Sequence, residues 1–93
     1  MVKKAKENIN PAKDKLSSSD KKHIIVLFND EFNSFDYVIE CLVEICNHDM
    51  TQAEQCAFIT HYNGKCDIKI GNMSKLRPLK DRLIEKGLNV NIQ

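Results

Sequence analysis

Large apolar side chains become frequent only from His23 onward, and this boundary most limits what the chain can fold into. The preceding residues 1–22 hold seven lysines, three acidic residues, no aromatic residue and few large aliphatic ones. Such a segment cannot bury enough apolar surface to offset the conformational entropy that ordering would remove. We therefore expect a flexible, disordered basic tail over residues 1–22 and one small folded domain over residues 23–93.

The composition is typical of a soluble globular protein. Apolar residues make up 42% of the chain and charged residues 29%, which argues against a disordered protein. No apolar run approaches the roughly 20 residues of a membrane-spanning helix, and the first lysines are followed by no apolar segment of a secretory signal. We therefore expect a cytoplasmic protein without a membrane partner, in which the four cysteines are reduced.

The first half of the domain predicts a strand followed by two helices. The apolar, β-branched run His23–Phe28 is typical of a buried strand. Helical spacing follows from Phe35 to Ile45, with Asn33 or Ser34 as its N-terminal cap. The next helix is predicted to start at Thr51, because Thr51 and Glu54 form a capping box. It should end near Tyr62, because Gly64 suits the left-handed residue just beyond a helix.

The second half predicts a strand, a helix and a last strand. Alternation places three apolar residues on one face of the first of these strands: Cys66, Ile68 and Ile70. A leucine stripe then predicts a helix that ends before Gly87, and Pro78 favours a start after Ser74 because proline fits best in a first turn. Alternation returns in the last strand with Leu88, Val90 and Ile92. The order predicts an α+β fold, a two-layer sandwich in β-α-α-β-α-β order with a three-stranded antiparallel sheet and three helices on one face.

Catalytic, metal-binding and nucleic-acid-binding functions find little support. The cysteines form no C-x2-C or C-x4-C pair of the kind that converges on zinc: Cys41, Cys46, Cys56 and Cys66. Free cysteine is among the most buried residue types, so we interpret these residues as core and expect neither a metal nor another cofactor. No motif of an activated nucleophile accompanies any Cys or Ser, so we expect no enzyme. The net acidic domain lacks an aromatic and basic stacking surface for nucleic acid.

Three polar residues form a candidate cation site. Asn29 and Asp30 follow the first strand, and His61 lies near the end of the second predicted helix. An amide oxygen, a carboxylate and a neutral imidazole nitrogen are acceptors that suit the N–H donors of an ammonium group. Asn and Asp are also common turn residues, and this is their more frequent role. The residues alone leave both interpretations open.

These residues lie within a longer resemblance to a known family. Four features are similar to ClpS, the bacterial adaptor of the Clp ATPase–protease machines: Asn29-Asp30-Glu31 after an apolar strand, the helix from Phe35 to Cys46, the segment Ala53–His61, and the string His61-Tyr62-Asn63-Gly64-Lys65. The resemblance is clear over residues 24–70 and looser over residues 71–93.

The resemblance implies a monomeric adaptor of the N-end rule rather than an enzyme. Such adaptors bind N-degrons, which are substrate proteins with a free α-amino group and a bulky apolar first side chain. They deliver the substrate to a Clp-type AAA+ ATPase (ClpA or ClpC) for degradation by ClpP. The alternative is a protein-interaction module of the same fold that has lost N-degron recognition.

The resemblance also assigns site residues. Asn29, Asp30 and His61 would bind the ammonium group, partly through water. The pocket wall would consist of Phe28, Asn33, Phe35, Ala57, Thr60 and Leu88. Helical spacing supports part of this wall, because positions 57, 60 and 61 share one helix face.

Several positions depart from the family pattern. Ala57 stands where the family usually has a large methionine, which predicts a wider pocket mouth. Thr60 replaces an aliphatic residue and Asn33 a smaller one, which predicts a more polar wall. We therefore expect relaxed size selection that admits β-branched or larger first residues. Residues 72–75 lack the acidic residue with which family members dock on the ATPase, and the basic tail would either engage that ATPase or serve only to solubilise the protein.

Overall fold

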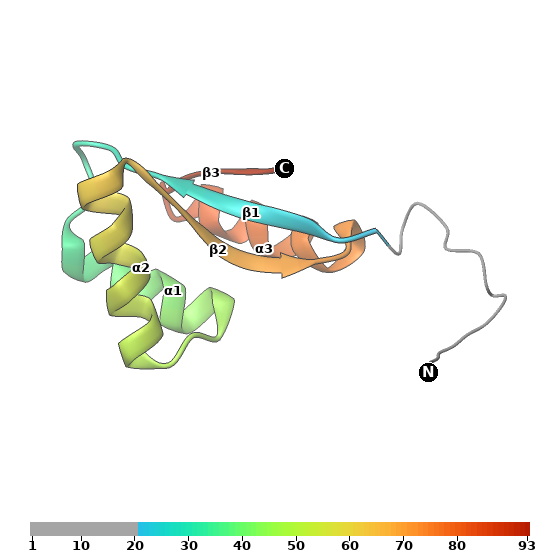
Figure 1. Ribbon diagram of the computed structural model, residues 1–93, viewed down its shortest axis with the longest axis horizontal. Coiled ribbons are helices and arrows are strands. Elements are labelled where there is room, and N and C mark those ends of the chain that lie inside the picture. Colours follow the sequence, from blue (N-terminus) through green and yellow to red (C-terminus); the bar gives the residue numbers. More distant parts are fainter. Residues whose placement is uncertain (1–20) are drawn as a thin grey trace, which may run out of the picture.

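The computed structural model describes residues 21–93, and these form a two-layer α+β sandwich (Figure 1). The elements are β1 (His23–Phe28), α1 (Phe35–Cys46), α2 (Met50–Asn63), β2 (Lys65–Gly71), α3 (Met73–Glu85) and β3 (Asn89–Ile92). The antiparallel sheet has the order β2-β1-β3, and the three helices pack on one face of it. The predicted fold is therefore confirmed. Residues 1–20, which hold nearly all of the expected basic tail, lie outside the described residues.

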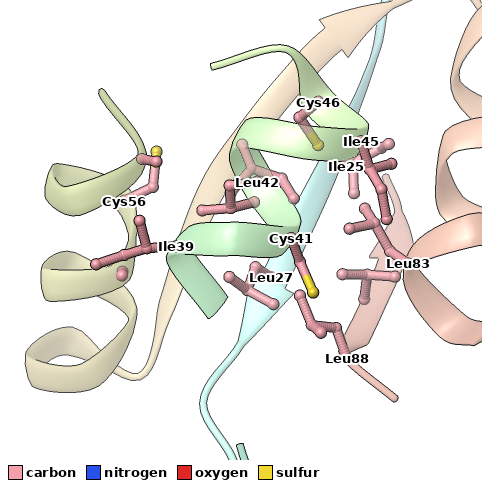
Figure 2. Close-up of a cluster of buried hydrophobic side chains, with 14 of the residues drawn as sticks. Ile25, Leu27, Ile39, Cys41, Leu42, Ile45, Cys46, Cys56, Leu83 and Leu88 are labelled. Carbon is pink, nitrogen blue, oxygen red and sulfur yellow. The ribbon is translucent and has the colours of Figure 1, made fainter. Parts of the chain in front are cut away.

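The core lies between the sheet and the helices (Figure 2). Ile25 and Leu27 of β1, Leu42 of α1 and Leu83 of α3 are each at most 2% exposed. Three of the four cysteines interpreted as core residues belong to the same cluster: Cys41, Cys46 and Cys56. Cys66 is only partly buried and packs against this cluster. Within residues 21–93, no helix has the length and apolar character that crossing a membrane requires.

Two of the three predicted helix starts are wrong. The helix α1 begins as predicted, with Ser34 Oγ accepting from the Tyr37 amide. The helix α2 begins before Thr51 because the carboxylate of Asp49 caps it, accepting from the Gln52 amide at 2.8 Å. The helix α3 begins at Met73, before the predicted start, because the side chain of Asn72 caps it. This cap compensates for the one helical hydrogen bond that Pro78 cannot donate. The predicted end of α2 at Gly64 is confirmed, with a φ of 93°.

A bulge in β2 changes which residues face the helices. Ile25 pairs with Lys69 and Val26 with Asp67, so Ile68 is an extra residue in β2. Ile68 is buried in the core, while Ile70 is 64% exposed, so the prediction that Ile70 shares its face is wrong. The bulge is held from the helix side by two hydrogen bonds.

The first bond joins the ammonium of Lys69 to the backbone oxygen of Cys46 at the end of α1, at 3.0 Å. The second joins Nε2 of the buried His48 to the backbone oxygen of Ile68 at 2.8 Å, with Nε2 as the donor in the tautomer protonated there. Both bonds use carbonyls that the regular ladder and helix leave free. The bulge thus ties β2 to the junction between α1 and α2.

Candidate functional site

An open cavity of about 570 Å³ lies where β1 ends, between α1, α2 and the chain just before β3. This volume falls within the range of about 300–1,000 Å³ that is usual for ligand pockets. All nine residues predicted for the amine site and the pocket wall line this one cavity: Phe28, Asn29, Asp30, Asn33, Phe35, Ala57, Thr60, His61 and Leu88. Segments far apart in the sequence are therefore brought together at a single hollow.

One backbone hydrogen bond joins the two segments that carry the polar residues of the cavity. The amide of Asn29 donates to the carbonyl oxygen of Gly64 at 2.9 Å. This bond joins the exit of β1 to the residue that ends α2, and His61 lies in the last turn of that helix. Figure 1 shows the loop between β1 and α1 beside the C-terminal end of α2. Asn29, Asp30 and His61 consequently share one rim.

The carboxylate of Asp30 organises the loop that follows β1. Its Oδ1 accepts from the backbone amides of Phe32 and Asn33, both at 2.9 Å, and its Oδ2 accepts from the Asn33 side-chain amide at 2.8 Å. Partial burial raises the pKa of Asp30, but the three hydrogen bonds outweigh it and hold the pKa below its ordinary value. Asp30 is therefore ionised at neutral pH and performs the turn role that its residue type suggests.

The hydrogen bonds of Asp30 within the loop leave its carboxylate one free acceptor position for an amine. A carboxylate offers about four acceptor positions, and three are filled by the loop itself. The remaining one is on Oδ2. The two interpretations that the sequence left open are therefore compatible in this geometry, and the amine-binding role of Asp30 stays a prediction.

A second set of bonds fixes the wall opposite the loop. The Asn33 side-chain amide also donates to the carbonyl oxygen of Gly87 at 2.9 Å, and the Tyr37 hydroxyl donates to that of Lys86 at 2.6 Å. Both acceptors belong to the turn that precedes Leu88, a buried wall residue. The loop and the wall are thus held together by side chains from the start of α1.

The two polar wall residues use their side-chain donors within the protein. Both hydrogens of the Asn33 amide are used within the protein, by Asp30 and Gly87. The hydroxyl of Thr60 donates to the carbonyl oxygen of Cys56, one turn earlier in α2, at 2.7 Å. Neither residue has a hydrogen-bond donor left for a bound molecule. The oxygens of both side chains can still accept hydrogen bonds, so the more polar wall stays a prediction.

Five further residues line the cavity and were not among the predicted site residues: Leu27, Glu31, Val38, Phe58 and Tyr62. Helical spacing offered a signal for one of them, because Val38 follows the predicted wall residue Phe35 by one turn. The rings of Phe58 and Tyr62 pack with their centroids 4.4 Å apart. Glu31 adds a second carboxylate beside Asp30.

The charge of the cavity favours a cation. The lining residues, all within the described part of the chain, include two carboxylates and no Lys or Arg. Among residues 21–93, no three His, Cys, Asp or Glu side chains gather closely enough to hold a metal ion. An organic cation with an apolar body fits the combination of acidic rim and apolar wall.

Comparisons with known proteins agree with the fold. The chain matches the family model described as ATP-dependent Clp protease adaptor protein ClpS over residues 18–91. It is also similar to a solved structure of Agrobacterium tumefaciens ClpS2 bound to L-phenylalaninamide, with a TM-score of 0.67 and 16% sequence identity over 80% of this chain and 96% of that chain. At this identity the likeness to ClpS2 establishes a shared fold. Because the family model spans most of the sequence, the chain belongs to the ClpS family of ATP-dependent Clp protease adaptors.

Proposed function

We propose that this adaptor binds N-degrons in the cavity at the end of β1. The free α-amino group of the substrate would lie at the rim formed by Asn29, Asp30 and His61, and the first side chain would enter between α1 and α2. The observation that carries this proposal is the single cavity that combines an acidic rim with an apolar wall. The ligand of the related ClpS2 structure, an amine with an aromatic side chain, has the chemistry that such a cavity suits.

The contacts available are sufficient for a useful affinity. Charge-assisted hydrogen bonds contribute about 1.5–3 kcal/mol each, and burying a Leu or Phe side chain adds roughly 1.5–3 kcal/mol. Two or three such bonds and one buried side chain approach the roughly −8 kcal/mol of a micromolar complex. This sum requires a preformed pocket, because ordering a loop on binding would consume part of the gain. The bonds of Asp30 and Asn33 supply that order in the free protein.

The pocket is expected to accept first residues of varied shape. Ala57 is a small wall residue at a position where a larger side chain would narrow the cavity. Space near the Cβ of the bound residue matters most for Ile and Val, which branch there. We therefore infer that β-branched first residues bind as well as Leu and Phe.

The bound substrate would then pass to a Clp-type AAA+ ATPase and its protease, ClpP. A reconstituted degradation assay tests recognition and delivery together. A fluorescent reporter with a free N-terminal Leu should be degraded faster when the adaptor is present, while the same reporter with an N-terminal Gly should not respond. An adaptor that binds the ATPase without accelerating the Leu reporter would instead be an interaction module that has lost N-degron recognition.

A further inference from the structure

A second hollow, of about 640 Å³, lies along the outer side of α2, and we refer to it as the α2 groove. It is lined by Phe35, Thr51, Glu54, Gln55, Phe58 and Ile59. Three of these residues are large and apolar, yet Phe35, Phe58 and Ile59 are 43%, 54% and 39% exposed. Their gathering along one hollow makes the groove a candidate contact site for another molecule.

The groove follows the length of α2. Thr51, Gln55 and Ile59 are spaced by four residues and form one ridge of the helix, and Glu54 and Phe58 form the next. The C-terminal end of α2 lies beside the loop after β1, where the cavity opens (Figure 1). The groove therefore starts near the cavity and runs toward the N-terminal end of α2.

Two aromatic residues separate the groove from the cavity. Phe35 and Phe58 line both hollows, so they form a shared wall. The ring of Phe58 is supported by Tyr62, with the centroids 4.4 Å apart and the ring planes tilted by 45°. This contact between the rings favours one position of Phe58 in the free protein, which would reduce the cost of ordering it on binding.

We propose that the α2 groove binds the third residue of the substrate and favours an apolar side chain there; this inference rests on the proposed function of the cavity. In an extended chain, successive side chains point to opposite sides, so the first and third residues face the same surface. Two residues advance the chain by roughly 7 Å, which is enough to step over one aromatic side chain. The first side chain would fill the cavity and the third would reach the groove, with the wall of Phe35 and Phe58 between them.

Three peptides with a free N-terminal Leu test the assignment by isothermal titration calorimetry. The first has Ala at positions two and three, the second has Leu only at position three, and the third has Leu only at position two. Leu at position three should tighten binding about tenfold over the Ala peptide, since partial burial of one Leu supplies a gain of this order. Leu at position two should give no comparable gain.

Two matched variants locate the effect. Ile59 lines the groove but not the cavity, so Ile59→Glu should remove the advantage of Leu at position three. Ile84 is similarly exposed on α3 and lines neither hollow, so Ile84→Glu should keep that advantage. L-phenylalaninamide has no third residue, and its binding reports the cavity alone.

The outcomes separate this inference from the proposed function. Failure of the wild-type protein to bind L-phenylalaninamide would overturn both. Normal binding of L-phenylalaninamide, together with equal affinities for the three peptides or a gain that survives in Ile59→Glu, overturns only the assignment of the groove. Self-association that Ile59→Glu abolishes, without any effect of the third residue, would assign the groove to a second copy of the chain and also overturn it.

Discussion

Asp30 and Asn33 bind each other twice, through the Asn33 backbone amide to Oδ1 at 2.9 Å and through the Asn33 side-chain amide to Oδ2 at 2.8 Å. The same side-chain amide reaches the carbonyl oxygen of Gly87, so one asparagine joins the acidic rim to the turn that carries Leu88. The cavity in this adaptor is therefore shaped before any substrate arrives.

Asp30→Ala should weaken binding of L-phenylalaninamide more than any single wall substitution. The change removes a carboxylate from the rim and also three hydrogen bonds that shape the loop. Loss of one charge-assisted bond alone corresponds to about 1.5–3 kcal/mol, or at least a tenfold rise in Kd by calorimetry. Asn33→Ala keeps the carboxylate and removes only the side-chain bonds of Asn33 to Asp30 and Gly87, so it should have a smaller effect. Equal affinities of Asp30→Ala and wild type would refute the role of Asp30.

Asp30 should also make stability depend on pH in the acid range. Because its pKa in the folded protein lies below the ordinary value of 3.8, its contribution to the free energy of unfolding is complete above that value. The contribution is lost as the pH falls through the lowered pKa. Urea unfolding of wild type and Asp30→Asn, followed from neutral pH down to about pH 2, should show a difference in stability that shrinks below pH 3.8. A constant difference over this range would contradict the hydrogen-bonded carboxylate.

Ala57→Met should restrict the choice of first residue. The longer side chain would occupy part of the cavity that Ala57 lines. Wild type should bind peptides beginning with Ile, Val, Leu and Phe, whereas the variant should lose several-fold more affinity for Ile and Val than for Leu. Gln52→Met serves as the control, because Gln52 is exposed on the same helix and lines neither hollow. Strict rejection of Ile and Val by the wild-type protein would show that Ala57 does not relax selection.

The cysteines should resist alkylation in the folded protein. Burial raises the pKa of the Cys46 thiol to about 11 and is the main cause that raises the pKa of the Cys66 thiol to about 12. At about pH 8, a thiol with a pKa near 11 is ionised in roughly one molecule in a thousand, and the thiolate is the reactive form. Mass spectrometry after iodoacetamide treatment should therefore find slow labelling in buffer and rapid labelling in urea. Fast native labelling of one cysteine would point to an activated thiol and to a catalytic function.

The sequence predicted the order of elements because its apolar pattern changes period clearly. His23–Phe28 is continuously apolar and Phe35–Cys46 repeats at helical spacing, and both became the elements expected. The failures arose where a local interaction decided the outcome. Asp49, rather than Thr51, caps α2, although both residue types are suitable caps. The bulge at Ile68 contains no glycine that would have indicated it. That bulge depends on Lys69 and His48 reaching carbonyls that only the folded chain brings close.

The cavity was predictable mainly through family resemblance. Position alone did not show that Asn29 and His61 would line one cavity, because it does not reveal the bond that joins Asn29 to Gly64 at the end of α2. Residue type also does not reveal that Thr60 and Asn33 use their hydrogen-bond donors within the protein and keep only acceptors for a bound molecule. Phe58 and Tyr62 were missed because an exposed aromatic pair on a helix carries no distinctive sequence signal.

Recognition of a free amine at the rim is tested most directly by backbone amide NMR with two peptides. The peptides share a sequence that begins with Leu and differ only in that one is acetylated at its N-terminus. The free peptide should shift the resonances of Asn29, Asp30 and His61 in a saturable manner, and the acetylated peptide should leave them in place. Equal shifts with both peptides, or shifts only at residues distant from these three, would contradict the account.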